Sequence, residues 1–207
     1  MIQTCKTSAG LLRVATVFAL FVVLPPVTQA QTQPATATVE RLLAAFVDAA
    51  QFADVQDRFE SLGEPVTTTH DLHYIGELTV RRQWRAWDDA QRGAFIAAFT
   101  ELSIMTYAAR FAGVGEETFR MLGSGEAGGS RIQVNVEIVR SDAAPVPLDF
   151  VLQETDAGEW KIANVLADGV SDLALKRAEY RSLLEERGFN GLIEDLRTQT
   201  EALAATE

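Results

Sequence analysis

The sequence predicts an α+β domain in which helices pack on a curved antiparallel sheet, and two observations support this class. Apolar residues recur at helical spacing in the first half of the chain and near its end, whereas residues 131–140 and 148–152 alternate between apolar and polar. The elements therefore come in blocks of helices, strands and helices, unlike the alternating order of nucleotide-binding α/β folds. A chain of 207 residues is long enough for one domain with a sizeable core.

The first thirty residues differ from the rest and predict a cleaved signal peptide. Lys6 and Arg13 are their only charges, and residues 14–24 form an apolar run that is too short to span a bilayer. Residues 28–30 then place small side chains at the −3 and −1 positions of a cleavage site. We therefore expect export to the periplasm with cleavage near Ala30. An uncleaved membrane anchor is the alternative interpretation.

The charge of the chain limits its partners. Cleavage after residue 30 removes two positive charges and no acid, which lowers the formal charge from −11 to −13. A chain with this charge is repelled by nucleic acid and by anionic bilayers. Cleavage also removes the single cysteine, Cys5, so the mature protein has no disulfide and no cysteine nucleophile.

Two helices are predicted between residues 39 and 84. Residues 31–38 are polar and rich in Thr and Ala, so we expect a flexible leader before the domain. From Val39 onward apolar residues recur at helical spacing, which predicts a helix. Gly63 and Pro65 predict a break, and residues 72–84 show a helical pattern again.

Asp88 opens the clearest helix of the sequence. Gln91 follows three residues later, as in a capping box, in which each side chain satisfies a backbone amide of the other. The helix that follows carries a broad apolar stripe that reaches Phe111. A stripe of this width indicates a helix that is buried on more than one side or that lines a cavity.

The middle of the chain predicts an antiparallel meander with one apolar face. Glycines between residues 123 and 129 predict a flexible, hairpin-like loop. Residues 131–140 then alternate between apolar and polar side chains, and residues 148–152 do so again after a turn. Residues 160–166 complete the predicted sheet.

Two further helices are predicted to close the domain. Ser171 can cap a helix that stops at Gly188, and Asn190 can cap a final short helix. We therefore expect a single domain over residues 39–200, followed by a short tail over residues 201–207.

The sequence offers no recognisable catalytic or metal-binding motif. His70 and His73 lack a nearby third and fourth ligand, so solvated residues at a helix start are the favoured interpretation. Tyr107 could act as a general acid on a buried helix, but a core residue with a satisfied hydroxyl is the commoner case. We therefore predict no catalytic residues, no metal and no cofactor.

Four segments, taken in order and spacing, resemble the MlaC family of periplasmic lipid-shuttle proteins, which is also called the toluene-tolerance Ttg2 family. The segments are residues 84–92, 95–108, 159–162 and 168–171, and the resemblance covers residues 38–200. Residues 107–111 and 171–180 look closer to the hopanoid-associated (HpnM-like) branch.

This resemblance implies a fold and a function. The fold would be an α+β domain related to the NTF2-like cone, with an apolar pocket between sheet and helices. The protein would carry a phospholipid or a hopanoid-type lipid between inner- and outer-membrane machinery. Its partners would be a membrane-embedded transporter complex, its periplasmic substrate-delivery subunits, or both. At Asn164, where family members often carry an acid, the resemblance assigns no role.

Apolar periodicity suggests which side chains contact such a lipid. Candidates are taken from the broad helix stripe and from the apolar faces of two strands: Phe95, Phe99, Leu102, Tyr107, Val134, Val136, Phe150 and Leu152. Two other functions stay open. One is an NTF2-like enzyme of the isomerase or dehydratase type, and the other is an accessory transporter subunit that binds no lipid.

Lipid burial also bears on docking. Two tails with about a dozen buried methylenes each gain about 20 kcal/mol, near the limit of non-covalent affinity, so release into water is excluded. Transfer therefore needs direct contact with a receiving partner. Because the chain is acidic, we expect that partner to be basic, and an acidic cluster at Glu185, Glu186, Glu194 and Asp195 is the candidate docking face. A merely solvated helix surface is the alternative.

Overall fold

The computed structural model describes residues 28–111, 118–141 and 143–206. Helices and strands follow each other in blocks, which confirms the α+β class. The elements are α1 (Thr28–Ala49), α2 (Val55–Thr69), α3 (Leu72–Trp84), α4 (Asp89–Arg110), β1 (Thr118–Glu126), β2 (Arg131–Val139), β3 (Val146–Glu154), β4 (Trp160–Ala167), β5 (Val170–Ser171) and α5 (Asp172–Ala204). Most of the predicted signal peptide, residues 1–27, lies outside the described residues.

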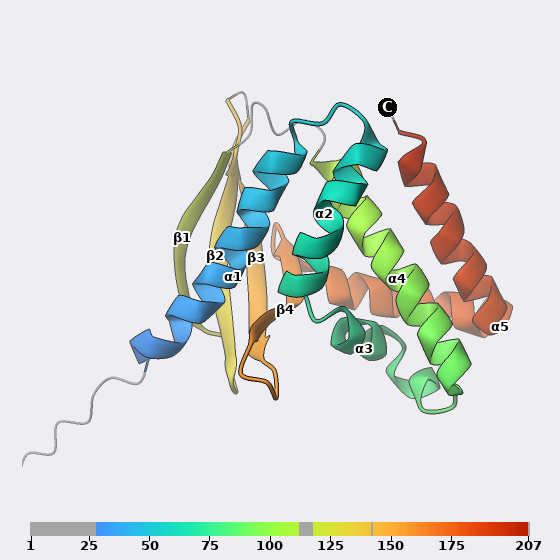
Figure 1. Ribbon diagram of the computed structural model, residues 1–207. Coiled ribbons are helices and arrows are strands. Elements are labelled where there is room, and N and C mark those ends of the chain that lie inside the picture. The colour runs from blue at the N-terminus through green and yellow to red at the C-terminus, as the bar shows by residue number, and fades with distance from the viewer. Residues whose placement is uncertain (1–27, 112–117, 142, 207) are drawn as a thin grey trace, which may run out of the picture.

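The five strands form one antiparallel sheet in the order β1-β2-β3-β4-β5. The helices lie together on one side of this sheet, and α1 crosses its face (Figure 1). Val134 on β2 is opposite Phe150 on β3, and both side chains are fully buried. The alternation that predicted these strands is confirmed, because their apolar side chains face the helices.

The glycine-rich segment is only in part a loop. Gly123 and Gly125 belong to β1, where a bulge between Met121 and Gly123 shifts the register. Gly123 has φ = 146°, a value that favours glycine, so the bulge accounts for one glycine of the segment. The turn itself contains Gly128 and Gly129, both with positive φ. The prediction of a loop was therefore wrong for the first two glycines.

Helix α1 begins before the predicted start, so the expectation of a flexible leader over residues 31–38 was wrong. Ala35 is fully buried, and the Thr38 hydroxyl donates a hydrogen bond of 2.9 Å to the carbonyl of Trp160 on β4. Small Ala and Thr side chains let this part of the helix approach the sheet closely. The Thr- and Ala-rich stretch that suggested flexibility therefore packs against the sheet.

Helix α2 continues through Gly63 and Pro65, so the predicted break was also wrong. A proline inside a helix costs about 3 kcal/mol, because it removes one backbone hydrogen bond and crowds the preceding turn. The fully buried side chains of Leu62 and Val66 lie on either side of Pro65 in the sequence, and their burial offsets this cost. The Asp54 side chain caps the start of the helix by accepting hydrogen bonds from two backbone amides.

The predicted capping of α4 and α5 is confirmed. Asp88 accepts the backbone amide of Gln91 at 2.8 Å, and the Gln91 side chain accepts the amide of Asp88 at 3.2 Å. Ser171 accepts the amide of Ala174 at 3.2 Å. Gly188 interrupts the helical geometry of α5 with φ = 68° and ψ = −168°. The helix then continues to Ala204, so most of the predicted tail is helical.

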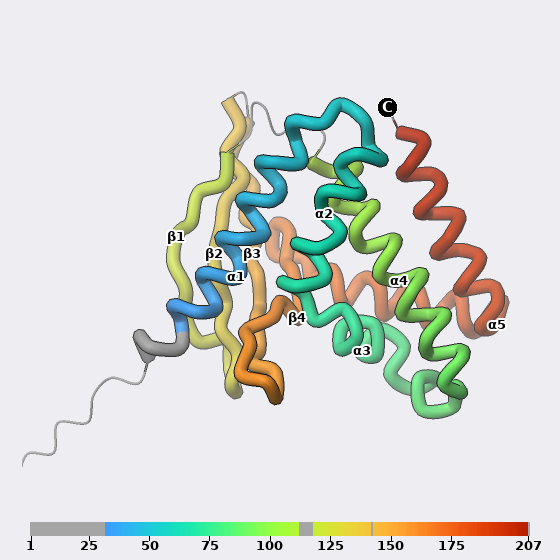
Figure 2. The backbone as a smooth tube through the Cα atoms, viewed as in Figure 1, coloured from blue at the N-terminus to red at the C-terminus, as the bar shows by residue number. Residues whose placement is uncertain are grey.

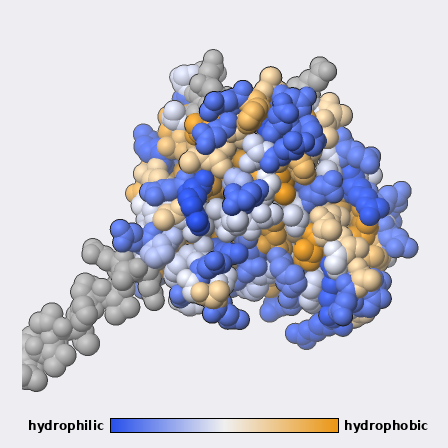
Figure 3. Space-filling view, viewed as in Figure 1, coloured by the Kyte–Doolittle hydropathy of each residue, from blue (hydrophilic) through white to orange (hydrophobic). Residues whose placement is uncertain are grey.

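One continuous core joins the helices to the sheet. The largest fully buried side chains come from α1, α4, β3 and α5, and they include Phe46, Phe95, Phe99, Phe150 and Tyr180. The backbone trace shows these elements around a common interior (Figure 2). Hydrophilic residues cover much of the outer face in this view, with apolar patches between them (Figure 3). Within the described residues, no helix combines the length and hydropathy needed to cross a membrane.

Candidate functional site

A cavity of about 180 Å³ lies where the ends of β3, β4 and β5 meet α3, α4 and α5. Most of its wall is apolar. Each of these six elements contributes apolar side chains, and Phe111 comes from the turn after α4. The apolar lining residues are Leu72, Ile75, Phe99, Phe111, Leu148, Val165, Ala167, Val170, Leu173 and Leu175. Val170 and Leu175 are also 52% and 57% exposed. These two side chains therefore reach both solvent and the cavity, as residues at a cavity mouth do.

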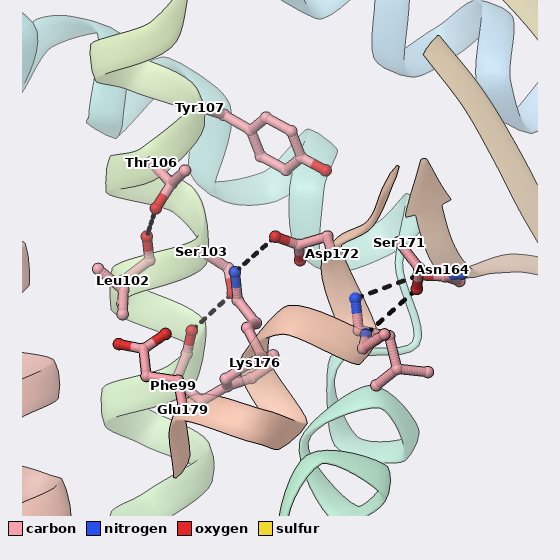
Figure 4. A network of polar contacts seen from close by, with 12 residues as sticks. Phe99, Leu102, Ser103, Thr106, Tyr107, Asn164, Ser171, Asp172, Lys176 and Glu179 are labelled. Atoms are coloured by element: carbon pink, nitrogen blue, oxygen red, sulfur yellow. Dashed lines mark hydrogen bonds and ion pairs between the residues drawn. The ribbon is translucent and has the colours of Figure 1, made fainter. Parts of the chain in front are cut away.

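Two hydroxyls in the α4 wall are already satisfied by their own helix. Ser103 donates to the carbonyl of Phe99, and Thr106 donates to the carbonyl of Leu102, each at 2.7 Å (Figure 4). Hydroxyls bonded back to the preceding turn have no proton left for a ligand. This part of the wall therefore contributes little hydrogen-bond donor capacity.

A charged pair marks the α5 side of the cavity. Lys176 donates to the carboxylate of Asp172 at 2.9 Å, one helical turn away (Figure 4). The Lys176 side chain is 17% exposed, whereas that of Asp172 is 42% exposed. Arg110 on α4 lines the same cavity. The cavity thus combines an apolar wall with charges that are partly in contact with water, which suits an amphipathic ligand.

His70 and Tyr107 form the one polar contact between helices that we find in the described wall of the cavity. The Nε2 atom of His70 lies 2.9 Å from the Tyr107 hydroxyl. The Nδ1 atom lies 3.1 Å from the carbonyl of Val66, which can only accept, so Nδ1 carries the proton and Nε2 accepts from Tyr107. The pair therefore joins the end of α2 to α4 without using a charge.

Burial determines the protonation of both groups. His70 is 4% exposed, and this burial lowers its pKa from the ordinary value of 6.5 to about 4, so the ring is neutral near pH 7. Burial also raises the pKa of Tyr107, with the nearby Asp172 carboxylate acting in the same direction. A general acid–base catalyst works best with a pKa near the working pH. Neither group has one, so their arrangement suits structure and ligand contact.

Asn164 holds the first turn of α5 against the sheet. Its Oδ1 atom accepts hydrogen bonds from the Ser171 hydroxyl at 3.1 Å and from the amide of Leu173 at 3.2 Å (Figure 4). One amide side chain on β4 therefore satisfies part of the helix start that bounds the cavity. This gives Asn164 a structural role that the sequence did not reveal.

The structure separates the eight predicted lipid contacts into two groups. Phe99 and Tyr107 line the cavity. The remaining six are at most 3% exposed and lie in the core outside the cavity wall: Phe95, Leu102, Val134, Val136, Phe150 and Leu152. Contact of these eight side chains with a lipid stays a prediction, and their position in the cavity wall favours Phe99 and Tyr107.

His70 is the clearest correction among the candidate residues. It was expected to be a solvated residue at a helix start, but it is buried at the junction of α2 and α3. Asp71 donates its amide to the carbonyl of Ile162 on β4 at 2.9 Å, and this contact draws the junction against the sheet. His73 is exposed, as expected. The Tyr107 hydroxyl is satisfied, as the commoner interpretation predicted.

The site offers no evident position for a metal. Among the described residues, no three His, Cys, Asp or Glu side chains come together in a way that could hold a metal ion.

The acidic cluster that the sequence offered as a docking face is less free than expected. Arg187 pairs with Glu194 at 2.8 Å and with Asp195 at 3.4 Å. Two of the four carboxylates in the candidate docking face are therefore already partly neutralised.

Comparison with known proteins agrees with this architecture. The chain is 25% identical over 126 residues to the intermembrane phospholipid transport system binding protein MlaC of Haemophilus influenzae, and the match covers 59% of either chain. The fold is similar to that of a solved phospholipid-binding protein from Ralstonia solanacearum in complex with a phospholipid. That match has a TM-score of 0.71 and 20% identity, and it covers 84% of this chain and 98% of the other.

The match to a protein family extends over most of the chain. The model of the family described as MlaC protein matches residues 36–198, which run from the first helix to the second part of α5. Helices α2, α3 and α4, all five strands and every residue that lines the cavity lie within this range, together with most of α1 and α5. The chain therefore belongs to the MlaC family.

Proposed function

We propose that this protein binds a lipid by its acyl tails and carries it through the periplasm between membrane-bound partners. The cavity between the sheet, α4 and α5 is the observation that carries the proposal, because it joins an apolar wall to a partly exposed charged pair. An amphipathic molecule would bury its apolar part against this wall and leave its polar part at the mouth. The bound phospholipid of the Ralstonia solanacearum neighbour supports the same ligand class.

The size of the cavity indicates how a lipid would be held. Ligand pockets usually measure about 300–1,000 Å³. A cavity of about 180 Å³ is smaller and approaches the size that holds a benzene molecule. A longer tail therefore requires the wall helices to move away from the sheet, and binding would enlarge the cavity.

The buried pair supports a carrier over the alternative of an NTF2-like enzyme. An isomerase or dehydratase needs a base that can take a proton near neutral pH. His70 has a lowered pKa, and its accepting nitrogen is already used by Tyr107. The cavity also argues against an accessory subunit that binds no lipid, since a subunit of that kind has no need for an apolar cavity with a mouth.

The proposal includes a location and partners. The apolar run at residues 14–24 and the small residues near Ala30 support export and cleavage. The name of the Haemophilus influenzae relative supports a transport system that works between two membranes. The partners would then be a membrane-embedded transporter complex or its periplasmic subunits, and the lipid would be a phospholipid or a hopanoid-type lipid.

Native mass spectrometry of protein purified from its own periplasm tests the proposal directly. We expect the mature chain to begin near Gln31 and to carry a lipid that solvent extraction releases. A protein that carries no lipid after gentle purification, and takes up none from phospholipid vesicles, would contradict the carrier function. Recovery of the full-length chain in the membrane fraction would contradict the location.

A pair of matched variants tests the cavity itself. Ala167 lies at its mouth and is exposed, so Ala167→Trp should obstruct the cavity without crowding the core. Ala127 is also exposed, but it lies in the turn between β1 and β2, away from the described cavity wall. We expect Ala167→Trp to lose most of its bound lipid and Ala127→Trp to keep it. Equal lipid content in both variants would place the lipid elsewhere.

A further inference from the structure

Five exposed arginines come together in a groove of about 690 Å³ between α3 and α5. They are Arg81, Arg82, Arg85, Arg177 and Arg181. The single acid that lines the same groove is Glu185, so the lining carries a formal charge of +4. The whole chain has a formal charge of −11, and this groove is therefore a strong local exception.

These arginines make no contacts that explain their position. Within the described residues, none of the five side chains takes part in a hydrogen bond, an ion pair or a ring contact. Other arginines of the chain are used internally: Arg58 is buried and bonds to backbone carbonyls, and Arg187 pairs with two carboxylates. Like charges on adjacent helices repel each other, so an unpaired cluster of this kind costs stability until an anion binds.

We propose that this arginine groove is a docking site for an acidic segment of a partner protein, whose Asp and Glu carboxylates pair with the arginines. Arginine presents a planar fork of donors that matches a carboxylate in two parallel hydrogen bonds. Arginines on two facing helices can hold carboxylates on both sides of one inserted segment. This is the reverse of the expectation that an acidic chain docks on a basic partner.

The structure favours a protein over a bilayer as the anion. A flat anionic membrane meets the whole acidic molecule, whereas a narrow protein segment meets the groove alone, since charges are screened beyond about 8 Å. Surfaces that bind membranes also insert aromatic or large aliphatic side chains. The exposed large apolar residues of the described chain are Val47, Phe52, Leu122, Val170 and Leu175, and none of them lines this groove.

The arginine groove and the lipid cavity share two helices, α3 and α5. The cavity is lined by the first turns of α3 and α5, through Leu72, Ile75 and Leu173. The groove follows along the same two helices, up to Arg85 and Glu185. A segment seated in the groove would therefore bear on both helices that bound the lipid cavity. This use in lipid transfer rests on the proposed function, whereas binding of the acidic segment does not.

A titration with a synthetic peptide tests the groove. The probe is a twelve-residue helix-forming peptide with Glu on one face, and its counterpart has Gln at every Glu position. Nuclear magnetic resonance of the purified, full mature protein should show shifts confined to α3 and α5 with the Glu peptide only. Added salt should weaken this binding, because exposed ion pairs are screened.

Two charge-reversed variants separate the groove from general charge. Arg177 lies in the groove, and Arg197 is an exposed arginine of α5 that lies outside it and has no partner among the described residues. We expect Arg177→Glu to weaken binding of the Glu peptide by about fivefold or more, and Arg197→Glu to change it less than twofold. Both variants should keep the lipid content of the unaltered protein, which reports separately on the proposed function.

Three results would overturn the proposal. The first is no binding of the Glu peptide at low salt, and the second is equal weakening by both variants. The third is binding of phosphatidylglycerol vesicles that Arg177→Glu abolishes, with no binding of the peptide. That third result would assign the groove to a membrane. Absence of lipid from the unaltered protein would contradict the proposed carrier function and leave the peptide result unaffected.

Discussion

Acid should destabilise this protein through His70, and the size of the effect follows from its burial. The ring is neutral in the fold, with a pKa lowered to about 4 by burial, whereas an unfolded chain restores the ordinary value of 6.5. The unfolded state therefore binds the proton more readily below pH 6.5. The stabilising contribution of the neutral ring is present above pH 6.5 and is lost progressively as the pH falls toward 4.

The expected magnitude is measurable. With these two pKa values, linkage gives a loss of about 2 kcal/mol in the free energy of unfolding between pH 7 and pH 5 from this residue alone. The hydrogen bond to the carbonyl of Val66 and the charge of Asp172 both raise the pKa of His70, and the value of about 4 already includes them. Urea unfolding of the mature protein at several pH values, followed by circular dichroism, measures the slope.

Two substitutions isolate the contribution of this ring. His70→Gln keeps a group that can accept from Tyr107 but does not titrate, so the loss between pH 7 and pH 5 should shrink by about 2 kcal/mol. His73→Gln removes the exposed histidine and should leave the loss unchanged. All other side chains are the same in the three proteins, so the difference between their pH profiles reports the substituted ring. Parallel pH profiles for the unaltered protein and His70→Gln would refute the reasoning.

Two glycines should resist substitution for different reasons. Gly76 has an ordinary helical position, but a Cβ atom there would lie 2.7 Å from the Cδ1 atom of Ile96, so the end of the Ile96 side chain must shift and Gly76→Ala should cost about 1 kcal/mol through overpacking. The double variant with Ile96→Val should recover part of this loss in urea unfolding, and a Gly76→Ala protein as stable as the original would contradict the tight α3–α4 contact. Gly188 has free space around it but φ = 68° and ψ = −168°, so Gly188→Ala should cost about 1–3 kcal/mol through backbone strain. An unchanged melting temperature for Gly188→Ala would show that α5 needs no kink at this position.

Local patterns predicted those parts of the fold that depend on local physics. The capping box of Asp88 and Gln91, the N-cap of Ser171 and the stop at Gly188 all involve residues close in sequence. The alternation around Val134 predicted a strand with one buried face, and every second side chain of β2 is buried. Capping and alternation need no knowledge of the tertiary fold, so one sequence was enough.

Features that depend on packing between distant segments were missed. Nothing near His70 indicates burial, since its environment is created by β4 and by Tyr107 from α4. The helix that covers the strands was also not predicted: α1 crosses part of the apolar face of the sheet, and the contact of the candidate strand residues with a lipid stays a prediction. Periodicity identifies which side of a strand is buried, but not which helix covers it.

The short last strand makes one wall of the cavity easy to open. Strand β5 has two residues, so the sheet gives this edge few backbone hydrogen bonds, and the start of α5 depends on the side chain of Asn164. Local opening requires breaking only the contacts of that region, far fewer than global unfolding. We therefore expect amides at β5 and the first turn of α5 to exchange with deuterium well before those of β2 and β3. A lipid tail could then enter at a rate set by this local opening, while the rest of the domain stays folded.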